Sequence, residues 1–186
     1  MLEAIQAADS AILLFIQNNL RFGALNLFFK AMSFLGDGGA LWVAAAVILL
    51  LFNKTRRGGL DLALSLLFAA VICNLVIKGI AARPRPYSTI EGLEILIKPL
   101  SSYSFPSGHA CSSFASATAL CLAFRKQGGA WAFLPAALIS LSRVYVGVHY
   151  PTDVLAGAAL GALVALAVYK LSCRFIKSDL TARKNE

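Results

Sequence analysis

Residues 59–77 read GLDLALSLLFAAVICNLVI, an apolar run of 19 residues that only Asp61 and Asn74 interrupt. A helix of about 20 apolar residues is what is needed to cross the hydrocarbon core of a bilayer. Of the whole 186-residue chain, 59% is hydrophobic and 14% is charged, whereas ordinary soluble domains carry about 25% charged residues. We therefore expect an integral membrane protein, which excludes a disordered chain, a disulfide-stapled secreted module and a soluble nucleotide-binding fold.

Apolar runs and the breakers between them predict an all-α, polytopic transmembrane bundle that forms one domain over residues 1–186. Five membrane spans are expected at residues 39–53, 59–81, 108–124, 129–149 and 153–173. Polar residues interrupt the segment 3–36, where an interfacial amphipathic helix leading into a sixth span is expected. Gly157 and Gly161 form a GxxxG step, which we interpret as packing within the bundle in preference to dimerisation. The cysteines are interpreted as buried core residues, because their spacing fits neither a zinc site nor a disulfide framework: Cys73, Cys111, Cys121 and Cys173.

Basic residues mark one side of the membrane. They occur in the loop at residues 54–57, at residues 125–126 and in the polar tail 177–186. Loops rich in Lys and Arg stay in the cytoplasm. Residues 82–107 and 149–152 are therefore predicted to lie on the extracytoplasmic side.

Ionisable side chains from four segments are predicted to gather at that extracytoplasmic level, namely Lys78, Arg83, Arg85, His109, Arg143, His149 and Asp153. A charge inside a span costs about 2.5–3.5 kcal/mol on insertion scales, so each of these groups needs a partner or a function. The sequence Pro-Ser-Gly-His at residues 106–109 is typical of a helix start, with Ser107 expected as the N-cap and Gly108 allowing close backbone approach. A helix N-terminus beside several cations predicts a phosphate site.

The same residues predict phosphoryl transfer. His149 and Asp153 are separated by a tight turn, so the carboxylate is expected to orient the ring as a nucleophile or base. His109, on another segment, is expected to protonate the leaving oxygen. Positive charge from Lys and Arg makes a metal or another cofactor unnecessary for this chemistry. Taken singly, Lys78 could instead snorkel to the interface and Arg143 could pair with Asp153.

These residues resemble the signature of the type 2 phosphatidic acid phosphatase (PAP2) family, K-x6-R-P, P-S-G-H and S-R-x5-H-x3-D. The three parts correspond to Lys78 with Arg85-Pro86, to residues 106–109, and to Ser142-Arg143 with His149 and Asp153, so the core motifs span residues 78–153. The resemblance implies that His149 attacks phosphorus, Asp153 orients it and His109 is the general acid. It implies phosphate binding by Lys78, Arg85, Ser107, Gly108 and Arg143. Arg83 is outside the motif and is given only a rim role.

The resemblance also implies a metal-independent, six-span phosphatase acting on a membrane lipid, similar to compact bacterial members. Undecaprenyl diphosphate is the first expectation for the substrate, with phosphatidylglycerophosphate, phosphatidate and lipid A as alternatives. The expected location is the bacterial cytoplasmic membrane, with the site facing outward and no nucleic acid or obligate protein partner.

Three other functions stay open. The nearest rival is a phosphatase that acts on a soluble phosphate ester. A transporter should place polar groups at several depths, whereas here they gather at one level. A silent lipid-binding protein would not need a nucleophile with its orienting acid.

The segment 87–103 mixes apolar residues, among them Leu96 and Ile97, with charged ones. We expect it to lie at the membrane surface as an amphipathic flap beside the path by which a lipid enters.

Overall fold

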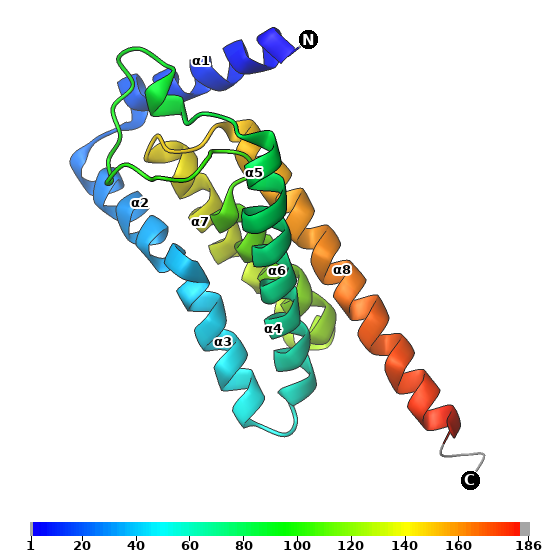
Figure 1. The fold of residues 1–186 in the computed structure, drawn as a ribbon. Coiled ribbons are helices and arrows are strands. Elements are labelled where there is room, and N and C mark those ends of the chain that lie inside the picture. Colours follow the sequence, from blue (N-terminus) through cyan, green and yellow to red (C-terminus); the bar gives the residue numbers. More distant parts are fainter. Residues whose placement is uncertain (1, 183–186) are drawn as a thin grey trace.

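The computed structural model describes the backbone of residues 2–182 and the side chains of residues 3–174, and within this range it contains helices and no strand. Figure 1 shows α1 lying across one end of a bundle formed by the remaining helices. The predicted all-helical class is confirmed. The α-helices are α1 (Leu2–Leu20), α2 (Gly23–Leu35), α3 (Ala40–Leu51), α4 (Arg56–Ala70), α5 (Lys78–Ala81), α6 (Gly108–Ala123), α7 (Phe133–Tyr145) and α8 (Pro151–Ala182).

Two segments of the described chain, Arg56–Ser88 and Pro151–Arg174, are long and apolar enough to cross a membrane. Gly23–Leu35 and Asp37–Leu51 meet that standard together as a pair bent by 49°. The bend arises because Gly38 and Gly39 have positive φ angles of 60° and 71°. The predicted span at 39–53 is thus the second half of a bent unit that begins at Gly23. The expected total of about six membrane helices is not confirmed, since α6 and α7 have only 16 and 13 residues.

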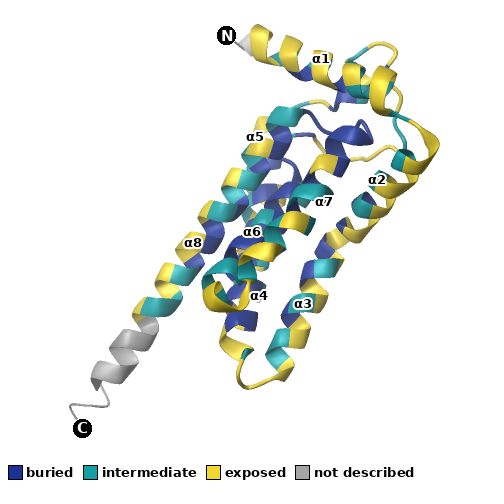
Figure 2. Ribbon diagram, turned by 180° about the vertical axis from the view of Figure 1, so that it is seen from behind, coloured by how far each residue is buried: buried dark blue, intermediate teal, exposed yellow. Residues whose placement is uncertain are grey.

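The outer faces of the bundle are apolar, as an integral membrane protein requires. Figure 2 shows exposed residues along α3 and α8. Leu75 and Ile80 are 76% and 81% exposed, and Leu51 and Leu163 are also exposed. In water such a surface would cause aggregation, whereas in lipid it is the favoured exterior.

Helix α6 lies in the middle of the bundle, packed against α4, α7 and α8. Its buried side chains are small, Ala, Ser, Thr and Cys, which lets neighbouring helices approach closely. A Cβ atom added to Gly161 of α8 would lie 2.1 Å from the carbonyl oxygen of Cys111, and one on Gly157 would lie 2.5 Å from that of Ser107. The glycine step therefore packs inside the bundle, as predicted.

Helix α4 continues through a π-helical stretch, Val71–Ile77, into α5. π-helical turns are rare and often mark functional sites. Lys78 follows the stretch as the first residue of α5, and its side chain is buried. Helix α5 lies near the end of the bundle that α1 covers (Figure 1). Residues 82–107 and 149–152 lie at this same end, which is called the site end below. The polar tail predicted for 177–186 lies outside the described side chains.

The segment 89–103 contains no helix. Leu96 and Ile97 pack against a buried cluster that includes Val146 and Val148. The segment is also held by α1, because Gln17 Nε2 donates to the Gly92 carbonyl at 2.9 Å. Leu96 and Ile97 are therefore partly covered by the protein core, and the place of the segment at the membrane surface stays a prediction.

Candidate active site

The predicted site residues come together at the site end of the bundle. A cavity of about 640 Å³ is lined by the side chains or backbone of Lys78, Arg85, Gly108, His109, Arg143 and His149. Ser107 and Asp153 are fully buried beside it and do not line it. Four segments distant in sequence thus deliver their polar groups to one place, as the motif spacing predicted.

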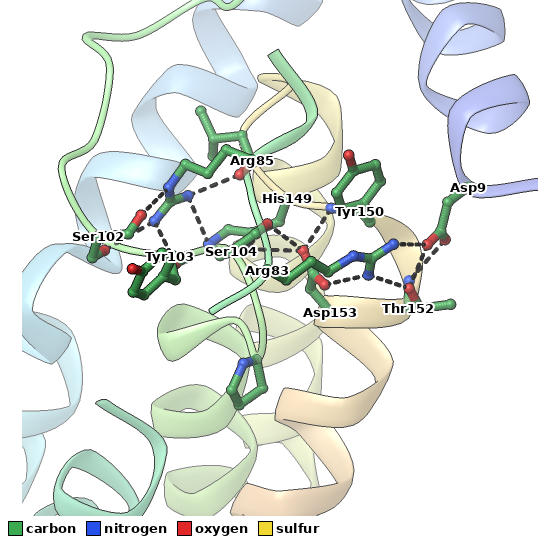
Figure 3. Close-up of polar contacts among 12 residues, drawn as sticks. Asp9, Arg83, Arg85, Ser102, Tyr103, Ser104, His149, Tyr150, Thr152 and Asp153 are labelled. Carbon is green, nitrogen blue, oxygen red and sulfur yellow. Dashed lines mark hydrogen bonds and ion pairs between the residues drawn. The ribbon is translucent and has the colours of Figure 1, made fainter. Parts of the chain in front are cut away.

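His149 and Asp153 lie side by side in the buried turn that leads into α8 (Figure 3). His149 Nδ1 is 3.5 Å from Asp153 Oδ2. The same carboxylate oxygen accepts hydrogen bonds from Ser104 Oγ at 2.5 Å and from the Tyr150 backbone N–H at 3.0 Å. Sequence reasoning missed Ser104, for which proximity to residues 106–109 was the only available signal.

The other ring nitrogen of His149 faces a cation. Arg85 Nη1 lies 3.4 Å from His149 Nε2. Because a guanidinium can only donate, this contact favours a ring that carries its proton on Nδ1, toward Asp153, and a lone pair on Nε2. Burial, reinforced by Arg85 and Arg143 and opposed by Asp153, lowers the pKa of His149 to about 3. The ring is therefore neutral at pH 7.

Arg85 is fixed in place by its surroundings. It donates to the carbonyl oxygens of Ser102, Val148 and Tyr103 at 2.7, 2.8 and 3.2 Å, and to Ser102 Oγ at 3.1 Å. These bonds tie the linker before α6 to the turn before α8. Most of its N–H groups are thus used within the protein, so Arg85 offers the cavity chiefly a fixed positive charge.

Within the described side chains, two buried polar atoms lack a hydrogen-bond partner, Ser107 Oγ and Arg143 Nε. Both residues belong to the predicted phosphate-binding set. Ser107 occupies the N-cap position of α6 but forms no side-chain cap, contrary to the sequence expectation. Arg143 is 1% exposed, and its Nη1 donates to Ser33 Oγ. Arg143 forms none of the ion pairs found in the described chain, so the alternative pairing with Asp153 does not occur.

His109 makes a contact that sequence reasoning did not anticipate. Its Nε2 lies 3.0 Å from Asp37 Oδ1 and 3.2 Å from the carbonyl oxygen of Ser33. Asp37 stands at the bend between α2 and α3 and lines the same cavity. No local pattern could have identified it, because the contact depends on how that bend meets the start of α6.

Arg83 does not occupy the rim position expected for it. Its side chain is 21% exposed and pairs with both Asp9 of α1 and Asp153, as Figure 3 shows. Its guanidinium also lies over the Tyr150 ring, 3.8 Å from the centroid. One signal for Asp9 was available in the sequence, since it shares a helical stripe with the apolar Leu13 and Ile16, four and seven residues later.

The cavity extends from these polar groups along an apolar groove between α3 and α4. Val43, Val47 and Leu50 line it from α3, and Leu66, Leu67 and Ala70 line it from α4. Asn74 lies between the groove residues and Lys78 in sequence and lines the cavity as well. The site thus combines a cationic head with an apolar extension.

The chain is similar in sequence and in fold to known proteins of one family. The model of the PAP2 superfamily matches residues 58–177. An undecaprenyl-diphosphatase of Sulfolobus acidocaldarius is 37% identical over 125 residues, which is 67% of this chain and 60% of that protein. A lipid A 4'-phosphatase of Bacteroides thetaiotaomicron is 30% identical over 98% of this chain and 83% of that protein. The crystal structure of a PAP2-type phosphatidylglycerolphosphate phosphatase from Bacillus subtilis superposes with a TM-score of 0.74 and 31% identity, over 92% of this chain and 87% of that one.

Proposed function

The chain belongs to the PAP2 superfamily, among relatives that are named phosphatases, and on that premise we propose that it removes a phosphate group from a membrane lipid. The match spans only 60% of the Sulfolobus enzyme, so the activity itself rests on the site. The residues proposed as catalytic are His149, His109 and Asp153, with Lys78, Arg85, Ser107, Gly108 and Arg143 as phosphate ligands.

The observation that carries the proposal is the pair of unpartnered buried donors, Ser107 Oγ and Arg143 Nε. A buried polar atom without a partner costs about 1–3 kcal/mol, so such atoms are rare in folded proteins and often have a catalytic or ligand-binding role. Both atoms belong to residues that the motif assigns to phosphate. Arg143 lines the cavity, where an anion with several acceptor oxygens would accept from its guanidinium and balance the surrounding cations, and Ser107 lies directly behind that lining.

The chemistry follows from the contacts of the two histidines. With its proton on Nδ1 held by Asp153, His149 attacks phosphorus through Nε2, and an N–P bond forms as the bond from phosphorus to the leaving oxygen breaks. His109 gives that oxygen a proton. Water then attacks the phosphohistidine, His109 takes a proton from the water, and the N–P bond breaks to release inorganic phosphate. The fixed cations stabilise the charge on the equatorial oxygens throughout.

A lipid substrate is favoured over a soluble one because of the apolar groove. An acyl or prenyl chain would pack along the apolar side chains between α3 and α4, whereas a sugar phosphate has no apolar part that could contact them. Because His149 and His109 lie at the site end, the proposal places turnover at the membrane face opposite the basic loops, which is extracytoplasmic by the positive-inside rule. Undecaprenyl diphosphate is the proposed lipid, and phosphatidylglycerophosphate, phosphatidate and lipid A are the alternatives.

The test is phosphate release by purified protein in detergent, compared across undecaprenyl diphosphate, phosphatidylglycerophosphate, phosphatidate, lipid A and glucose 6-phosphate. His149→Ala is the inactive comparison, and Arg56→Gln, which changes an exposed cation at the basic end, is the matched control. Lipid turnover that disappears only in His149→Ala supports the proposal and ranks the substrates. Preference for glucose 6-phosphate, or activity that survives in His149→Ala, contradicts it.

A further inference from the structure

Helix α1 contributes a buried carboxylate to a charged network behind the catalytic pair. Asp9 is 2% exposed, although the helix that carries it is largely exposed (Figure 2). Its Oδ1 accepts the Thr152 backbone N–H at 3.1 Å, and its Oδ2 accepts Arg83 Nη2 at 2.9 Å and the Thr152 hydroxyl. A buried carboxylate is costly unless it is paired and hydrogen-bonded, and here both oxygens have partners.

Arg83 connects this carboxylate to the site. Its Nη1 donates to Asp153 Oδ1 at 2.6 Å and to Thr152 Oγ1 at 2.9 Å, while its Nη2 also donates to Gln6 Oε1 at 2.6 Å. Figure 3 shows the guanidinium between the two carboxylates. Oδ1 of Asp153 is thereby fixed by Arg83, and the remaining oxygen, Oδ2, faces His149.

The net charge of the network gives a reason why two carboxylates surround one guanidinium. Arg83 and Asp153 alone would form a neutral pair, which would leave little negative charge for the His149 ring. With Asp9 included, the three groups sum to −1. A ring that becomes positively charged when phosphorylated is stabilised by a fixed negative charge beside it, and in a buried site that interaction is weakly screened.

We propose that Asp9 and Arg83 are positioning residues for Asp153, so that the surface helix α1 is a working part of the active site. This rests on the proposed function. Neither residue touches the cavity, and both act through Asp153 on the tautomer and charge of His149. The consequence is that changes in α1 alter the chemical step and leave lipid binding in place.

The kinetic test compares Asp9→Asn and Arg83→Gln with two controls, Glu3→Gln on the same helix and Arg56→Gln at the basic end, both of which change exposed residues. We expect kcat to fall about tenfold to a hundredfold, as when outer-shell partners are removed elsewhere, with KM nearly unchanged. The controls should match the wild-type protein. Because the two residues act as one unit, the double variant should be no slower than the slower single variant.

A second readout does not depend on turnover. The chain has two histidines, so 15N NMR of labelled imidazoles, assigned with His109→Gln, reports which nitrogen of His149 carries the proton. The wild-type ring should be protonated on Nδ1, and Asp9→Asn and Arg83→Gln should mix the two tautomers. Arg83→Lys, which keeps the charge, and Thr152→Val, which removes one hydroxyl, should give smaller changes and serve where a stronger variant does not fold.

The outcomes separate the two proposals. An inactive wild-type protein would refute the proposed function, while the NMR tautomers would still decide whether α1 positions Asp153. Folded Asp9→Asn protein with wild-type kcat and a pure Nδ1 tautomer would overturn the positioning role. A rise in KM at constant kcat would also overturn it, because that would place Asp9 in substrate binding.

Discussion

His109 and Asp37 meet at the cavity, with His109 Nε2 3.0 Å from Asp37 Oδ1. The histidine begins α6, and the aspartate stands at the bend between α2 and α3, 72 residues earlier. Burial and Arg143 lower the pKa of His109, whereas the Asp37 carboxylate opposes them and so favours the protonated ring that a general acid needs. The bend between α2 and α3 thus places a carboxylate beside the proposed general acid.

The general-acid role of His109 should be visible when substrates with different leaving groups are compared. His109→Gln should slow an alkyl phosphate by about 10²–10⁴-fold, the usual contribution of a general acid. Asp37→Asn should cause a smaller loss of the same kind. Both should affect p-nitrophenyl phosphate far less, because nitrophenolate leaves without a proton. Glu91→Gln, an exposed acidic residue in the linker before α6, is the control. Equal losses on both substrates would count against the acid role.

The groove should control chain length. Ala70→Phe places a large ring among groove residues of α4, and should raise KM for a long-chain lipid about tenfold, equivalent to about 1.4 kcal/mol. A short-chain or soluble phosphate ester should be unaffected. Ala44→Phe, on an exposed part of α3 outside the cavity lining, is the matched control. Steady-state kinetics on both substrates decide the point, and an unchanged long-chain KM would remove the groove from the proposal.

The contact between α6 and α8 should not tolerate a side chain larger than that of glycine at position 161. Gly161→Ala puts a methyl group 2.1 Å from the Cys111 carbonyl oxygen, and overpacking of this kind typically costs 1–3 kcal/mol, occasionally more. Thermal unfolding in detergent should show a clear decrease in Tm. Gly79→Ala, where nothing lies within 4 Å of the new Cβ, should be neutral or stabilising by about 0.5–1 kcal/mol. Similar Tm values for both variants would mean that α6 and α8 are not packed as described.

Metal removal should have no effect. Lys78, Arg85 and Arg143 supply the positive charge around the proposed phosphate position, so turnover should continue in EDTA. Vanadate, a phosphate mimic, should inhibit competitively, and Arg143→Lys should weaken that inhibition because lysine cannot replace the planar guanidinium. Strict dependence of phosphate release on an added divalent ion would contradict the proposed mechanism.

The orientation can be tested independently of activity. A reporter fused after Arg57 should be cytoplasmic, and one fused after Glu91 should be extracytoplasmic, because the basic loops and the site end lie at opposite ends of the bundle. Both reporters on one side would overturn the proposed topology.

Several features followed from local sequence. The apolar runs predicted helices with boundaries close to those of α4–α5, α6 and α8, because hydrophobicity over a membrane-length segment depends on each segment alone. The three-part motif predicted which side chains would share a site. Arg83 was misjudged because a motif says nothing of residues beside it. The contact of Leu96 and Ile97 with the core was not predicted, because amphipathicity does not say which surface the apolar side covers.

The sequence by itself therefore determined that the chain is helical and lipid-facing, and which residue types are proposed for the phosphate chemistry, since these depend on composition and spacing. Only the tertiary structure decided that α2 and α3 form one bent unit, that Asp37 meets His109, and that Asp9 reaches Asp153 through Arg83. Each of these is a contact between segments more than 60 residues apart or a bend at a pair of glycines. Their geometry depends on how whole helices pack, which no local pattern specifies.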